Sequence, residues 1–144
     1  MLTLDKIYHA AFVLKEVARR TDLIHAPNLC PDAELYLKTE NLQVTGSFKL
    51  RGAYYKISQL TDEQKRAGII ACSAGNHAQG VALAATRQGA KSIVFMPDSA
   101  PISKVEATKR LGAEVCLVNG AYDDAYEAAV RRQEETGATF IHPF

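Results

Sequence analysis

The sequence predicts an α/β fold with three layers, in which a parallel sheet lies between helices. Three observations support this prediction. From residue 41 onward, short apolar runs alternate with amphipathic helical stretches. Gly89, Gly112 and Gly137 each follow a predicted helix, at the position where glycine accommodates the left-handed conformation that ends many helices. The chain has 144 residues, which suffice for one domain around one hydrophobic core.

Residues 1–40 are predicted to form a segment distinct from the α/β domain. Apolar residues recur at steps of three and four over residues 4–20, which predicts a helix with Thr3 as its N-cap. Prolines make residues 25–32 a predicted loop, and the polar and apolar alternation over residues 34–38 is typical of a short strand. We therefore place a domain boundary near residue 40.

Residues 41–144 are predicted to form the α/β domain itself. The expected helices cover 47–60, 76–88, 102–111 and 121–136, and the expected strands cover 68–72, 92–96, 114–118 and 139–142. The chain ends at Phe144, just after a predicted core strand, where an α/β domain normally continues into a loop and a helix. We expect this chain to be incomplete on its own.

Composition excludes several classes of partner. Seventeen basic and sixteen acidic residues give a formal net charge of +1, so no global field favours nucleic acid or an anionic membrane. No stretch approaches the roughly 18 consecutive apolar residues of a spanning helix. We expect a cytoplasmic protein with a small-molecule partner. Cys30, Cys72 and Cys116 lie far apart and match no zinc spacing, so we expect reduced packing cysteines and no metal site.

The first candidate site is a lysine near the start of the helix predicted over residues 47–60. Lys49 follows the predicted N-cap Ser47, and the aromatic Phe48 precedes it. One turn on, Gly52 and Ala53 are small enough to leave room for a planar ligand. A lysine amine in such a place can attack an aldehyde to form a Schiff base. The same pattern also fits an exposed helix lysine, and the spacing alone leaves both interpretations open.

The second candidate site is the loop Ser73-Ala74-Gly75-Asn76-His77, between a predicted strand and a predicted helix. Free backbone N–H groups and the helix dipole favour an anion there, such as a carboxylate or a phosphate. An ordinary turn capped by Ser73 or Asn76 is the alternative. His77 is expected to cap or pack rather than to act as a general base.

A nucleotide site is a weaker alternative for this loop. Asp98 lies near the position of a ribose-binding acid, but the loop lacks the G-x-G-x-x-G pattern of dinucleotide-binding folds. Gly75 and Gly80 have the spacing of a phosphate-binding P-loop, yet Val81 and Ala82 follow in place of Lys and Ser or Thr.

Two motifs together resemble a known family. They are Thr45-Gly46-Ser47-Phe48-Lys49-Leu50-Arg51-Gly52-Ala53 and Ser73-Ala74-Gly75-Asn76-His77-Ala78-Gln79-Gly80. Their identity and order resemble the threonine dehydratase (threonine ammonia-lyase) branch of the fold type II pyridoxal-phosphate enzymes. The likeness continues from Lys38-Thr39-Glu40-Asn41 to Phe140-Ile141-His142-Pro143-Phe144, and so covers nearly the whole chain.

The resemblance implies a role for each site residue. Lys49 would bind pyridoxal 5'-phosphate covalently and later remove the α-proton of the substrate. Phe48 would pack against the cofactor ring, and Asn76 would hydrogen-bond the ring hydroxyl. The backbone amides of Ser73, Ala74, Gly75, Asn76 and His77 would bind the substrate carboxylate, at the anion site that helix physics also predicts. The implied reaction converts L-threonine, and also L-serine, to a 2-oxo acid and ammonia.

The resemblance also implies a larger assembly. Residues 41–144 would be the small domain of a fold type II enzyme, and residues 1–40 would pack on a large domain that this chain lacks. The loop that cradles the cofactor phosphate would lie in that absent part, so this chain alone would be incompetent or weakly active. The full-length enzyme is expected to be a homo-oligomer.

Three alternatives stay open. One is another enzyme of the same fold, such as serine racemase or threonine synthase. Serine racemases are expected to carry a serine where this chain has Ala74, and a methyl group cannot transfer a proton, which favours dehydration. A second is a non-catalytic fragment that binds an anion or a partner without turnover. The third is the nucleotide-binding domain considered above.

Overall fold

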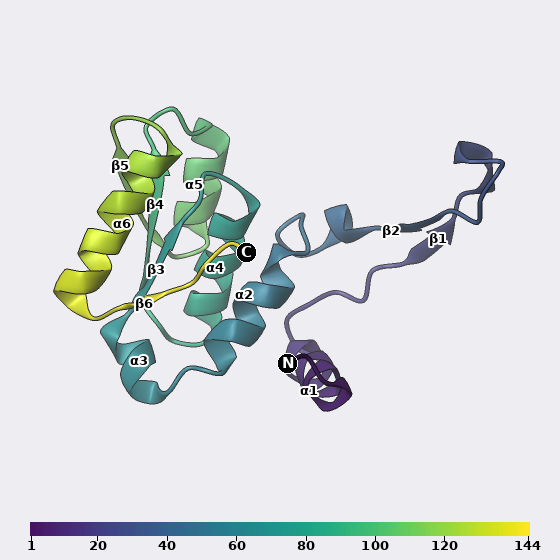
Figure 1. The fold of residues 1–144 in the computed structure, drawn as a ribbon, viewed down its shortest axis with the longest axis horizontal. Coiled ribbons are helices and arrows are strands. Elements are labelled where there is room, and N and C mark those ends of the chain that lie inside the picture. The colour runs from purple at the N-terminus through teal and green to yellow at the C-terminus, as the bar shows by residue number, and fades with distance from the viewer.

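A computed structural model describes residues 1–144 as two regions (Figure 1). We call residues 1–48 the N-terminal segment and residues 49–144 the α/β body. The body gathers its helices around a sheet, whereas the hairpin of the N-terminal segment projects away from it (Figure 1). None of the helices combines the length and apolar character needed to cross a lipid bilayer.

The sheet of the body is parallel, as predicted. Its strands are β3 (Ile69–Cys72), β4 (Ser92–Pro97), β5 (Glu114–Val118) and β6 (Thr139–Phe140), in the spatial order β5-β4-β3-β6. From β3 the chain adds β4 and then β5 on one side, and it then returns to place β6 on the other side of β3. In the register, Ile70 lies opposite Ile93 of β4 and Phe140 of β6.

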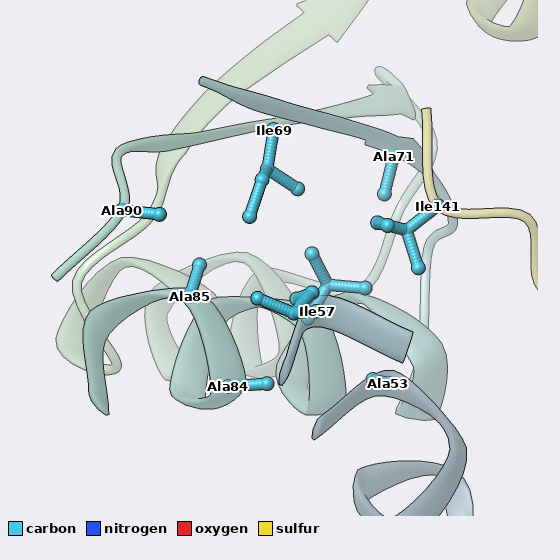
Figure 2. Packing of buried hydrophobic residues seen from close by; sticks show 9 residues of the cluster. Ala53, Ile57, Ile69, Ala71, Ala84, Ala85, Ala90 and Ile141 are labelled. Carbon is cyan, nitrogen blue, oxygen red and sulfur yellow. The ribbon is translucent and has the colours of Figure 1, made fainter. Parts of the chain in front are cut away.

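Helices cover both faces of this sheet and complete the predicted three layers. On one face lie α2 (Lys49–Ser58), α4 (Asn76–Arg87) and α5 (Ile102–Arg110), and on the other lies α6 (Tyr122–Thr136). Successive strand residues point to opposite faces. Ile69 and Ala71 therefore pack with α2 and α4 (Figure 2), while Ile70 and Cys72 pack with α6.

Helix ends in the body follow local sequence signals. Gly89, Gly112 and Gly137 have positive φ angles of 71°, 97° and 68°, as predicted for residues that follow helices. An additional helix, α3 (Asp62–Ala67), was not predicted. Its signal is a capping box, in which the Thr61 hydroxyl accepts from the Gln64 N–H at 3.2 Å and the Gln64 side chain accepts from the Thr61 N–H at 2.9 Å.

The first helix is shorter than predicted. It covers α1 (Leu4–Leu14) rather than residues 4–20, and Thr3 occupies the N-cap position without a side-chain cap. The cause lies in tertiary hydrogen bonds: the Arg19 N–H donates to Gln43 Oε1 at 2.8 Å, and Gln43 Nε2 donates to the Arg19 carbonyl at 2.9 Å. These bonds replace helical ones, so the chain leaves the helix before Arg19.

A small hairpin follows α1. Here β1 (Leu23–His25) pairs antiparallel with β2 (Tyr36–Lys38), with the 3-10 helix η1 (Pro27–Leu29) between them and η2 (Glu40–Leu42) after them. The predicted loop is thus wrong at His25, which belongs to β1. A strand of three residues is too short to show the alternation by which strands are identified.

The three cysteines are free thiols, as predicted. Cys72 is fully buried, and Cys116 packs against the cluster beneath α6. Burial raises the pKa of the Cys72 thiol to about 11, so it stays protonated and inert at neutral pH. Cys30 differs from the prediction, because it lies half-buried in a loop outside the core clusters.

Candidate active site

The sheet topology creates a crevice between β3 and β6. After β3 the chain crosses to α4 on one face, whereas β6 is reached from α6 on the opposite face. Adjacent parallel strands with opposite connections leave a gap outside their carboxyl ends, where ligands of such folds bind. The segments that leave this edge are Ser73–His77 after β3 and residues 141–144 after β6.

A cleft of about 730 Å³ opens beside this edge and contains Lys49. Its lining comes from α2 with its N-cap, from the first turn of α4, from β6 and from the chain after β6: Phe48, Lys49, Gly52, Ala53, Lys56, His77, Phe140, Ile141, His142, Pro143 and Phe144. Three predicted site residues, Phe48, Lys49 and His77, are therefore brought together. A Cβ atom added at Gly52 would meet no atom within 4 Å, so this side of the cleft is open, as predicted.

Local structure holds Lys49 at the start of α2. Its backbone N–H donates to the Ser47 hydroxyl at 3.3 Å, although the N-cap position belongs to Phe48 rather than to the predicted Ser47. The next residue, Leu50, is fully buried and anchors the first turn. The Lys49 amine lies 5.7 Å from the centroid of the Phe48 ring and donates to the Pro143 carbonyl.

His77 lines the same cleft as this amine. Its side chain is buried, and Nε2 lies 2.9 Å from the Ile141 carbonyl oxygen, so Nε2 carries the hydrogen that it donates. Burial lowers the pKa of His77, the Lys49 and His142 charges lower it further, and the bond to Ile141 partly opposes them. The imidazole is therefore neutral at pH 7. It joins the first turn of α4 to the end of β6, which is the packing role that we predicted.

The loop before α4 keeps unpaired donors. Gly75 is the N-cap residue, and no side chain caps the helix, so the ordinary turn capped by Ser73 or Asn76 is not observed. The Ser73 hydroxyl instead accepts from the Gly75 N–H at 3.2 Å. The backbone N–H groups of Asn76, His77 and Ala78 have no acceptor within the protein. Together with the helix dipole, these donors can hold an anion.

The structure does not bring all predicted residues into the cleft. Ser73, Ala74, Gly75 and Asn76 are absent from its lining. The Asn76 side chain is turned toward α5, where its Oδ1 accepts from Lys104 Nζ at 3.4 Å. The predicted roles of these loop residues therefore stay predictions.

Sequence reasoning missed the part of the cleft that follows β6. This part of the lining consists of His142, Pro143 and Phe144. The signal that points to residues 142–144 is topological: once β6 is placed beside β3, the chain leaving it must border the crevice. That placement is not visible in a local sequence pattern.

Comparisons with known proteins agree on the kind of chain that carries this cleft. A family model described as pyridoxal-phosphate dependent enzyme matches residues 14–144. The L-threonine ammonia-lyase of Thermotoga maritima is 53% identical over 146 aligned residues, which cover 100% of this chain and 36% of that protein. This chain thus spans little more than a third of the length of that relative.

Solved structures share the fold. Maize serine racemase superposes with a TM-score of 0.90 at 36% identity, over 98% of this chain and 44% of that chain. The processed form of threonine deaminase isoform 2 from Solanum lycopersicum superposes with a TM-score of 0.86 at 35% identity, over 99% of this chain and 44% of that chain.

Proposed function

This chain belongs to the pyridoxal-phosphate-dependent enzymes, and we propose that it forms the lysine-bearing part of a longer enzyme that deaminates L-threonine, and also L-serine. The observation that carries the proposal is the Lys49 amine in a cleft at the switch point of the sheet, on the same edge as the unpaired N–H groups of α4. The name and the 53% identity of the Thermotoga maritima relative support threonine as the substrate.

The cleft residues fit two parts of pyridoxal phosphate. An aldehyde requires an amine, and Lys49 Nζ lies within the cleft. A flat ring requires an apolar wall and an open side, which the exposed Phe48 ring and the bare surface at Gly52 supply. Lys49 and Phe48 would therefore hold the aldehyde end and the ring. We propose that the phosphate is held by the part of the enzyme that lies outside this chain.

The proposed reaction divides the work between the cofactor and this chain. When bound, pyridoxal phosphate supplies an electron sink for the substrate α-carbon. The N–H groups of Asn76 and His77 hold the substrate carboxylate, which orients the α-hydrogen. Lys49 Nζ removes that proton, and the β-hydroxyl then takes up one proton and leaves as water, so that the α-proton and the hydroxyl group together are lost as one water molecule. Addition of water releases ammonia and a 2-oxo acid, which is 2-oxobutanoate from threonine and pyruvate from serine.

Racemisation is the second candidate activity, because maize serine racemase superposes closely on this chain. Ala74 argues against it. A racemase needs a second acid or base on the face opposite the lysine, and the half-buried methyl group of Ala74 has no proton to transfer. Full-length enzyme that converts L-serine to D-serine faster than to pyruvate would overturn the dehydratase proposal.

The proposal also covers the N-terminal segment and the assembly. We propose that residues 1–40 pack on the part of the enzyme that this chain lacks, which is supported by exposed apolar side chains such as Phe12 at 76% and Leu23 at 64%. A homo-oligomeric enzyme, a small amino-acid substrate and a cytoplasmic location are further parts of this proposal, and they rest on the family resemblance.

The test is to trap the cofactor on its lysine. The protein is mixed with pyridoxal phosphate and reduced with borohydride, and peptide mass spectrometry locates the modified lysine. We expect selective modification at Lys49, its loss in Lys49→Ala, and little change in Lys91→Ala, which removes an exposed lysine. Modification scattered over surface lysines would contradict the proposed site. Selective modification of Lys49 in a full-length enzyme that does not turn over threonine would favour the non-catalytic alternative.

A further inference from the structure

Helices α2 and α4 make a very close contact at Gly80. A Cβ atom added there would lie 3.1 Å from the carbonyl carbon and oxygen of Lys49 and 3.2 Å from the nitrogen of Leu50. All three are backbone atoms of the first turn of α2, so they cannot rotate away as a side chain would. A substitution at Gly80 must therefore displace either α4 or the turn that carries Lys49.

Space, rather than backbone conformation, requires glycine at this position. Gly80 lies inside α4 and is not among the glycines with positive φ. In the middle of a helix, glycine is less favourable than alanine by roughly 1 kcal/mol, so its presence there calls for a packing reason. The contact with Lys49 provides that reason.

The contact belongs to a row of residues along α4 that faces α2. Ala84, one turn after Gly80, packs with Ala53 and Ile57 of α2 (Figure 2), and Gln88, one further turn on, donates to the Tyr54 carbonyl at 3.0 Å. Residues spaced by four lie on one helix face, so α2 rests along this face. Gly80 is the member of the row that lies against Lys49.

We propose that Gly80 is a positioning residue for Lys49, which sets the separation between the amine and the anion-binding end of α4. One helix carries both features, because the unpaired N–H groups begin at Asn76, one turn before Gly80. A Cβ at Gly80 pushes α4 and the first turn of α2 apart, and so changes the position of the amine relative to the end of α4. The contact is relieved by a shift of a few tenths of an ångström, and since a misplacement of about 1 Å can cost roughly 100-fold in rate, we expect a several-fold effect. The inference rests on the proposed role of Lys49.

The experiment compares Gly80→Ala with Ile57→Val. Ile57 is fully buried at the far end of α2, and its shortening lowers stability by about 0.5–1.5 kcal/mol without adding an atom near Lys49. Two quantities are measured: acylation of Lys49 by acetic anhydride relative to the exposed Lys91, without cofactor, and the yield of borohydride-trapped adduct. For Gly80→Ala we expect the acylation of Lys49 relative to Lys91 to change several-fold and the adduct yield to fall several-fold. Ile57→Val should change neither.

Three outcomes separate the hypotheses. If Gly80→Ala matches Ile57→Val in both measurements at equal melting temperature, Gly80 does not position Lys49. If the unmodified protein forms no adduct but Gly80→Ala still changes the acylation of Lys49, the proposed function fails while the positioning role stands. If Gly80→Ala does not fold, the acylation is repeated in trimethylamine N-oxide, which restores compact states, and the same comparison decides.

Discussion

The α/β body and the N-terminal segment hold together by different forces. In the body, strands such as β3 are buried along their whole length, and apolar clusters fill both faces of the sheet. In the N-terminal segment both hairpin strands are exposed throughout, and polar bonds fasten the chain to α2. A region with its own core specifies its structure internally, whereas the hairpin exposes apolar residues that its own fold does not cover.

The polar attachment centres on Glu40. Its carboxylate accepts two N–H groups from Arg51, at 2.9 and 2.8 Å, and the Thr21 hydroxyl at 2.5 Å. The guanidinium also donates to the Arg19 carbonyl at 3.1 Å. Arg51 lies two residues after Lys49, so this network ties the N-terminal segment to the turn that carries the proposed cofactor lysine.

The largest effect is expected from a cavity in the body. Ile70 is 1% exposed and packs beneath α6. Ile70→Ala should lower the free energy of unfolding by about 2–5 kcal/mol, because it removes buried methyl groups and leaves a cavity. Urea unfolding followed by circular dichroism measures this loss. A loss below about 1 kcal/mol would show that the body is not the source of stability.

Glu40→Gln should have the next largest effect. In the unmodified chain the pKa of the Glu40 carboxyl lies at about 2, against an ordinary value of 4.5, mainly because of the hydrogen bonds from Arg51. Since the folded pKa is the lower one, this stabilisation is complete above pH 4.5 and is lost as pH falls toward 2. Because Arg51 is 33% exposed, we expect a loss of at most about 2 kcal/mol at pH 7.

Unfolding measured against pH tests the role of Glu40. Between about pH 4.5 and pH 2, the free energy of unfolding should change less steeply with pH in Glu40→Gln than in the unmodified protein. Glu34→Gln is the matched control, because Glu34 lies in the same segment with a side chain that is 79% exposed. An equal change of slope in both variants would assign the acid sensitivity to general charge rather than to the bond with Arg51.

A smaller effect is expected at the cap of α3. Thr61→Ala removes the hydroxyl that accepts from the Gln64 N–H, which should cost about 1 kcal/mol. Thr61→Ser keeps the acceptor and should recover most of that loss. Melting temperatures of the two variants give the comparison. Equal destabilisation by both would mean that packing of the Thr61 methyl group, and not the cap, stabilises this helix.

The smallest effect is expected in the hairpin. Ile24 is 48% exposed, so Ile24→Ala should change the unfolding free energy of this chain by less than about 0.5 kcal/mol. It makes the same change of side chain as Ile70→Ala. In a full-length enzyme, the same substitution should destabilise more if residues 1–40 pack on the remaining chain, and an unchanged value there would count against that proposal.

What the sequence predicts well is the part of the fold encoded over short distances. Strands such as β4 and helices such as α4 and α6 fall within two residues of their predicted ends, because apolar periodicity and a glycine such as Gly137 mark them locally. The end of α1 could not be predicted in this way. It is decided by bonds between Arg19 and Gln43, whose pairing depends on the tertiary fold.

The candidate site also combines features that a local motif predicts with features that depend on the tertiary fold. Lys49 and Phe48 are identified by a local motif, and the structure places them in the cleft. The Pro143 carbonyl and the His77 bond to Ile141 join residues far apart in sequence, so only the sheet order reveals them. Asn76 shows the limit of a motif, because its side chain contacts Lys104 while its predicted partner belongs to a bound cofactor.

The small side chains of α4 have an entropic consequence. From His77 to Ala85 every residue of this helix is buried, and Ala78, Gly80, Ala82, Ala84 and Ala85 have no side-chain rotamers to lose. Burying a helix of long side chains would cost up to about 2 kcal/mol per residue in lost rotamer freedom. The helix that presents the anion donors is thus immobilised at little entropic cost, and its N–H groups are already fixed in place before any ligand arrives.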